Sequence, residues 1–198
     1  MIEFLYDCVS KPLQGYYHSY SNCGWHYSVF DKEVGQNEFR EEINDIIKDY
    51  NIGYELSKEG EILALSETGL EEITNPSPTA YDPANIDNRI KAAILKFRRY
   101  RSSQEDRRDA IRDLADVLEF LRPKLTEVLT KKDEKDLFQI ANGFGIRHHN
   151  DKQKTDYERG IWYNWMFYFY LATIHTAIAV LNKSSETIVS ESDNEVSF

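Results

Sequence analysis

The sequence predicts a mainly α-helical protein, in which a helical bundle follows a small N-terminal α+β part that contains a β-hairpin. Two observations predict the bundle: apolar residues recur at helical spacing through residues 82–121, and residues 161–181 contain no charge. The hairpin is predicted by two short apolar segments, residues 52–56 and 61–65, which a four-residue turn with a glycine joins.

The N-terminal part, residues 1–73, is predicted to be a helix-plus-hairpin subdomain. Residues 32–50 form the predicted helix, because Phe39, Ile43 and Ile47 repeat at helical spacing with acidic residues on the other side. Residues 1–31 are rich in aromatic residues but show no clear period, so no element is assigned there. A lone two-stranded hairpin is marginal in water, and we therefore expect it to pack on the helix or on the second half.

A predicted linker, residues 74–81, carries two prolines and separates this subdomain from a bundle at residues 82–183. Asp82 and Pro83 suit the start of the first bundle helix. Its apolar stripe consists of Ile86, Ile90, Ala93, Ile94, Phe97 and Tyr100. Residues 184–198, rich in Ser, Asp and Glu, are predicted to form a flexible acidic tail.

The second bundle helix is predicted to start at a capping box of Ser103 and Asp106 and to end or kink at Pro123. Its buried face consists of Ile111, Leu114, Ala115, Leu118 and Leu121. A shorter helix is predicted over residues 133–142. The last helix is predicted to run from about residue 155 to about residue 181.

The chain of 198 residues has a net charge of −10, which is unevenly distributed. Residues 89–112 carry 9 bases against 3 acids, whereas residues 1–88 carry 5 bases against 17 acids. This distribution argues against a general nucleic-acid binder but is compatible with a local phosphate-binding groove.

The cysteines, Cys8 and Cys23, are too few for a disulfide framework, and we expect a cytoplasmic protein. Their spacing with His18 and His26 matches no zinc pattern, so the sequence predicts no metal and no cofactor.

The strongest candidates for chemistry are Arg147, His148 and His149, which adjoin the predicted start of the last helix. An arginine there suits a phosphate, and two imidazoles suit proton transfer at neutral pH. The alternative is a polar loop whose imidazoles bond to nearby carbonyl groups or face water. Further phosphate contacts are predicted at Arg98, Arg101, Lys152 and Lys154, with the alternative of a solvated helix face.

The uncharged run at residues 161–181 is long enough to span a bilayer. Its scattered polar residues and the absence of a flanking basic cluster favour a buried bundle helix instead. We therefore expect no membrane association, and a single-span membrane effector is the alternative.

Residues 82–183, with the Asn142–Asn150 stretch ahead of a long last helix, resemble the HEPN superfamily of small helical bundles. In that family an arginine, followed after four to six residues by a histidine, forms a metal-independent RNase site that is commonly completed across a dimer. The resemblance implies that Arg147 contacts phosphate. Residues 39–65 look like the accessory N-terminal regions of abortive-infection proteins.

The resemblance implies a role in prokaryotic anti-phage or stress defence, with RNA, a second copy or a partner protein of a defence system as the partner. The histidines stand one and two residues after Arg147, not four to six. Two functions therefore stay open: a metal-independent endoribonuclease that uses Arg147, His148 and His149, or a non-catalytic interaction and dimerisation module that binds a protein or nucleotide.

Overall fold

The chain divides into two units. The computed structural model describes residues 1–74, 82–125, 129–146 and 156–195. The first unit contains Met1–Leu65 together with Arg98–Tyr100, and the second contains Ser66–Phe97 and Arg101–Phe198. The division falls just after Leu65, which is earlier than the predicted linker.

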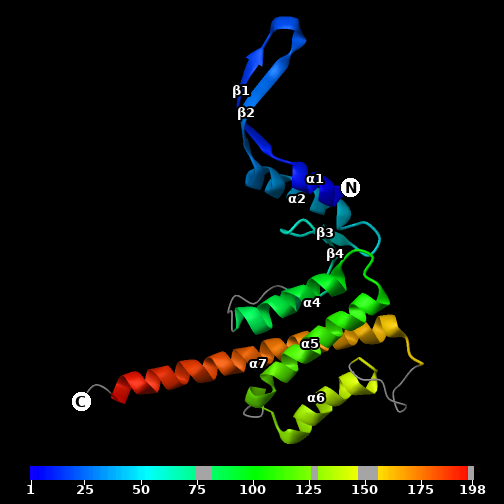
Figure 1. Cartoon of the computed structure of the whole chain (residues 1–198), viewed down its shortest axis with the longest axis vertical. Helices are drawn as coiled ribbons and strands as arrows, with labels where there is room; N and C mark the ends of the chain where they lie inside the picture. Colours follow the sequence, from blue (N-terminus) through cyan, green and yellow to red (C-terminus); the bar gives the residue numbers. More distant parts are fainter. Residues whose placement is uncertain (75–81, 126–128, 147–155, 196–198) are drawn as a thin grey trace. The chain divides into compact units, whose positions relative to one another are not determined.

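The predicted fold class is confirmed: helices make up most of the described chain, and the strands belong to two small antiparallel hairpins in the first unit (Figure 1). One of these hairpins, β3 (Tyr54–Leu56) with β4 (Ile62–Ala64), lies where the sequence predicts it. The other lies within residues 1–31, whose sequence shows no clear period.

This second hairpin is formed by β1 (Lys11–His18) and β2 (Gly24–Asp31), between α1 (Ile2–Cys8) and α2 (Lys32–Ile47). In Figure 1 the ribbon extends away from α1 and α2. Aromatic residues occupy both faces of the ribbon. The sequence therefore lacks the apolar–polar alternation by which a half-buried strand is recognised.

The base of the ribbon is anchored on the first turn of α2. Asp31 is the N-cap of this helix and its carboxylate accepts a hydrogen bond from the Val34 amide at 3.0 Å. A Cβ atom at Gly35 would lie 2.5 Å from the backbone nitrogen of Lys11, so only glycine permits this close approach. Lys11 also forms an ion pair with Glu38 of α2. These contacts hold the start of β1 against the helix.

Both edges of the short β3–β4 hairpin are bonded by side chains from helices. The Asn44 amide of α2 accepts a bond from the Leu56 nitrogen at 2.6 Å and donates to the Leu56 carbonyl at 3.3 Å. The Glu3 carboxylate of α1 accepts from the Ile62 nitrogen at 2.9 Å, and the Tyr100 nitrogen donates to the Ile62 carbonyl at 2.9 Å. The hairpin thus avoids the marginal stability of an isolated two-stranded ribbon.

The second unit is the helical bundle. It contains α3 (Glu71–Thr74), the π-helical turn η2 (Pro83–Asp87), most of α4 (Asn88–Arg98), α5 (Gln104–Leu125), α6 (Lys131–Gly143) and α7 (Arg159–Glu195). Its core is built around α5 and α7, and the rings of Phe97 and Phe167 stack at a centroid distance of 3.9 Å. The predicted buried face of α5 is confirmed at all five positions. Of the predicted α4 stripe, Tyr100 alone is exposed, at 42%, because α4 ends at Arg98.

The predicted helix start at Ser103 is confirmed. Its hydroxyl accepts from the Asp106 nitrogen at 3.1 Å, and the Asp106 carboxylate accepts from the Ser103 nitrogen at 3.0 Å. The observed end of the helix lies close to the predicted one at Pro123, since α5 continues for two further residues, to Leu125.

The last helix also differs from its predicted bounds. It begins at Arg159, a few residues after the predicted start, and continues to Glu195 instead of ending near residue 181. The predicted flexible tail is therefore helical over most of its length. Serine and acidic residues do not stop a helix as glycine or proline would, and the tail contains neither.

Candidate functional site

The site predicted from the sequence falls on a segment that the structure does not describe. Arg147, His148, His149, Lys152 and Lys154 all lie outside the described residues. Whether these side chains converge on a phosphate therefore stays a prediction. The structure does describe both ends of the segment, Ile146 and the residues from Asp156 onward.

The two ends of this segment are held beside each other and beside arginine side chains. The Tyr157 hydroxyl donates to the Phe144 carbonyl at 2.9 Å, and the two rings meet edge to face at 5.1 Å. Arg112 of α5 donates from Nε to the Ile146 carbonyl at 3.1 Å. Burial raises the pKa of Tyr157, and the Tyr163 hydroxyl raises it further, whereas the positive charges of Arg159 and Arg108 oppose the shift.

The two other predicted phosphate contacts, Arg98 and Arg101, belong to different units. Arg98 is only 8% exposed, and its guanidinium donates to the Ala64 carbonyl at 2.9 Å and to the Glu55 carboxylate at 2.5 Å. These bonds give Arg98 a structural role under the β3–β4 hairpin and leave little of its surface for a phosphate. Arg101 is exposed and adopts a left-handed backbone conformation, with φ of 63°, between α4 and α5.

A more complete candidate site is the β1–β2 ribbon, which was not predicted from the sequence. One face carries a row of aromatic side chains. The Tyr17 and Trp25 rings meet edge to face at 5.8 Å, Trp25 stacks on Tyr27 at 6.2 Å, and Tyr27 lies 6.4 Å from Phe30. The Tyr27 ring also covers Gly15, where a Cβ atom would lie 2.6 Å from Cδ1 of the ring. All four aromatic side chains are exposed to solvent.

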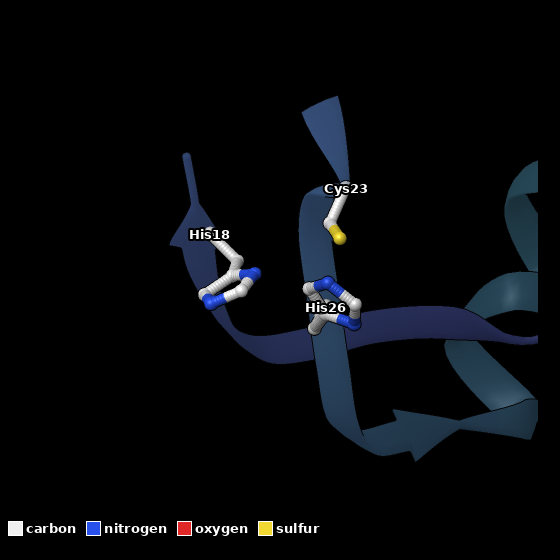
Figure 2. Close-up of side chains that lie close together, drawn as sticks. All are labelled: His18, Cys23 and His26. Carbon is white, nitrogen blue, oxygen red and sulfur yellow. The ribbon is translucent and has the colours of Figure 1, made fainter. Parts of the chain in front are cut away.

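The opposite face carries histidines. Tyr16 pairs with His26 across the strands, and their rings stack at a centroid distance of 5.5 Å. His18 lies two residues further along β1, so its ring meets that of His26 edge to face at 5.8 Å. Cys23 follows the 3₁₀ turn η1 (Tyr20–Asn22), and Figure 2 shows its sulfur directed toward the His26 ring.

The strand register brings His18 and His26 together, and the turn before β2 brings Cys23 to them; nothing in their linear spacing indicates this. The donor atoms of His18, Cys23 and His26 all lie within 4.8 Å of one another, and all three residues are exposed. A sequence signal did exist: two segments with several aromatic residues flank the turn at residues 19–23 and carry Gly15 and Gly24. Recognition of that hairpin would have paired residue 16 with residue 26.

The uncharged run predicted to be a buried helix lies within α7. The stretch Arg159–Lys183 is long and apolar enough to cross a membrane, although the core helix of a soluble protein passes the same test. Met166, Phe167, Leu171 and Ile174 are fully buried in the bundle core. His175 is partly buried, and its Nε2 donates a hydrogen bond to the Ile73 carbonyl oxygen at 2.9 Å, so its imidazole has a partner within the fold.

Comparison with protein-family models, with curated proteins and with solved structures finds no match to this chain.

Proposed function

We propose that this protein is a non-catalytic interaction module that self-associates through the β1–β2 ribbon. The resemblance of its C-terminal bundle to the HEPN superfamily makes prokaryotic anti-phage or stress defence the expected setting. One observation carries the proposal: the ribbon exposes six aromatic side chains, which the other elements of the first unit do not cover. They are Tyr16, Tyr17, Tyr20, Trp25, Tyr27 and Phe30, with exposures between 44% and 76%.

The aromatic area on one face of the ribbon supplies about half of a standard interface. A fully buried aromatic side chain removes about 150–250 Å² from water. At the observed exposures, the four side chains of this face, Tyr17, Trp25, Tyr27 and Phe30, offer on the order of 400 Å² of contact surface. A standard protein–protein interface buries about 800 Å² on each partner, whereas an isolated hairpin is marginally stable in water. A contact between two such faces would cover the aromatic side chains and stabilise the hairpin.

The charge distribution of the ribbon favours a second copy of this chain as the partner. Residues 10–31 contain one base, Lys11, and one acid, Asp31, in a chain whose net charge is −10. The ribbon is thus a neutral region where two acidic copies can meet without strong repulsion. It does not suit RNA, because stacking platforms for single strands lie in grooves with positive charge. Here Lys11 is already paired with Glu38, and α2 carries five acidic residues.

The exposed face suggests how two copies meet. Strand pairing at an outer edge of the two-stranded sheet would leave the aromatic face exposed. We therefore expect this face to pack on the same face of the second copy about a two-fold axis.

Sedimentation equilibrium of the full chain at about 1–100 µM tests the proposal. We expect a monomer–dimer equilibrium that the double substitution Tyr17→Ser with Trp25→Ser weakens at least about tenfold, since tryptophan and tyrosine are enriched among the interface residues whose truncation costs more than about 1 kcal/mol. Trp165→Ser is the matched control, because Trp165 is an exposed tryptophan of α7, at 44%. A wild-type chain that stays monomeric throughout, or equal effects of both variants, would contradict the proposal.

The endoribonuclease remains a second candidate, supported by one specific observation. Arg112 contacts Ile146, and Arg108 and Arg159 act on Tyr157, so positive charges surround both ends of the segment that carries the predicted catalytic residues. Three arginines at one place favour phosphate binding.

The test for this candidate is cleavage of total RNA in EDTA. If Arg147→Ala with His149→Ala abolishes cleavage and Lys131→Ala, an exposed change on α6, does not, the chain is an enzyme. Absence of cleavage by the wild-type chain favours the interaction module.

A further inference from the structure

The end of the β1–β2 ribbon carries three potential metal ligands in one cluster. His18 is the last residue of β1, Cys23 follows the turn, and His26 lies on β2. In Figure 2 the His18 ring and the Cys23 sulfur approach the His26 ring from two sides. Two imidazoles and a thiol form a ligand set that suits a borderline-soft divalent ion such as Zn²⁺.

The distances between the donor atoms are only about an ångström longer than those in a tetrahedral zinc site. A tetrahedral ion with Zn–N of about 2.0 Å and Zn–S of about 2.3 Å holds its ligand atoms about 3.3–3.6 Å apart. The donor atoms of the three residues are already within 4.8 Å of one another. Rotation of the exposed side chains about their χ angles covers the remaining ångström without movement of the strands.

The backbone of the turn directs Cys23 over the face that carries the histidines. Ser21 and Asn22 both adopt left-handed conformations, with φ of 54° and 60°, and Gly24 follows with φ of 78°. Left-handed backbone is uncommon at serine, and such conformations concentrate where the chain has a functional reason to hold them. Here the turn brings a thiol back toward two imidazoles of the flanking strands.

The cluster has no competing role within the described residues. Neither imidazole has a hydrogen bond or an ion pair with another described side chain or carbonyl, and Cys23 is a free thiol. Ring contacts position the histidines instead: Tyr16 stacks on His26, and Tyr20 lies 6.3 Å from His18. The ligands are therefore oriented and remain accessible to an ion from solvent.

We propose that His18, Cys23 and His26 bind one Zn²⁺ ion, with water in the fourth coordination position. The ion ties β1 to β2 across the turn, so that binding and ordering of the ribbon end are coupled. This site does not depend on self-association of the ribbon, because all three ligands come from one copy.

The test uses the full chain, purified with a non-thiol reductant and stripped of metal. Titration with Zn²⁺ by calorimetry should give one ion per chain with a dissociation constant of about 1 µM or tighter. Titration with Co²⁺ should give a thiolate charge-transfer band and the visible bands of a tetrahedral ion. Cys23→Ser, His18→Ala and His26→Ala should each weaken Zn²⁺ binding about 100-fold or more.

Two further variants separate ligation from folding. Cys8→Ser removes the other thiol of the chain, which is exposed in α1, and should leave binding and both spectra unchanged. Cys23→His should retain Zn²⁺ binding but lose the thiolate band. Wild-type protein that takes up no Zn²⁺ at about 100 µM overturns the proposal, as does binding that all three ligand substitutions leave intact.

Discussion

Replacement of Arg98 should unfold the β3–β4 hairpin locally and lower the stability of the first unit. Its guanidinium bonds to the Ala64 carbonyl at 2.9 Å and to Glu55 at 2.5 Å, and Arg98 is 8% exposed. In Arg98→Ala the carbonyl loses a hydrogen bond worth about 1 kcal/mol. The ion pair adds about 1 kcal/mol, because the Glu55 side chain is 39% exposed and therefore screened.

The buried methylene groups of Arg98 add about 1 kcal/mol of lost packing, which brings the expected loss to about 3 kcal/mol. For a unit of this size, that loss lowers Tm by about 12 °C or more. Arg99→Ala is the matched control, because Arg99 is exposed and lies 3.7 Å from Glu61. It should cost less than about 0.5 kcal/mol.

Thermal unfolding followed by circular dichroism measures the loss, and hydrogen exchange of a peptide spanning residues 54–64 locates it. Equal Tm values for the two variants would refute the structural role of Arg98. A variant that instead loses RNA binding at unchanged stability would favour the phosphate contact predicted from the sequence.

Three further changes probe the bundle and the ribbon. Leu118→Ala removes a fully buried side chain and should lower the free energy of unfolding in urea by about 2–5 kcal/mol. The control Phe120→Ala changes an exposed side chain and should lower it by less than about 0.5 kcal/mol. Similar losses in the two variants would show that Leu118 is not in the core. The pKa of Tyr157 is raised in the folded protein, so folding favours the protonated hydroxyl. Its contribution to the free energy of unfolding is therefore full below the unfolded pKa of about 10 and falls as the pH rises above that value. Tyr157→Phe should make stability depend less on pH between about pH 9 and pH 11. Gly15→Val should displace the Tyr27 ring and weaken self-association, and an unchanged dimer constant in sedimentation would argue against the ribbon as the interface.

Much of the bundle follows from local pattern. The stripe on α5 and the capping box at Ser103 depend on residues three or four apart, which a helix brings together whatever surrounds it. The β3–β4 hairpin is likewise local, since a glycine-containing turn joins its strands. No element could be predicted for residues 1–31, because a ribbon with large side chains on both faces lacks the alternation of apolar and polar residues that marks a half-buried strand.

By itself, the sequence determined the longer helices, the short hairpin and the apolar character of the last helix, all of which depend on neighbours along the chain. The tertiary structure decided which distant residues meet. Arg98 lies at the end of a helix with a basic face, which from the sequence suggests an exposed side chain. In the structure the backbone of Arg99 pairs with Leu63 of β4, and Arg98 is buried in an ion pair with Glu55. His18, Cys23 and His26 match no linear metal motif. Antiparallel register places His18 and His26, eight residues apart, on one face of the ribbon, and the turn before β2 brings Cys23 to them.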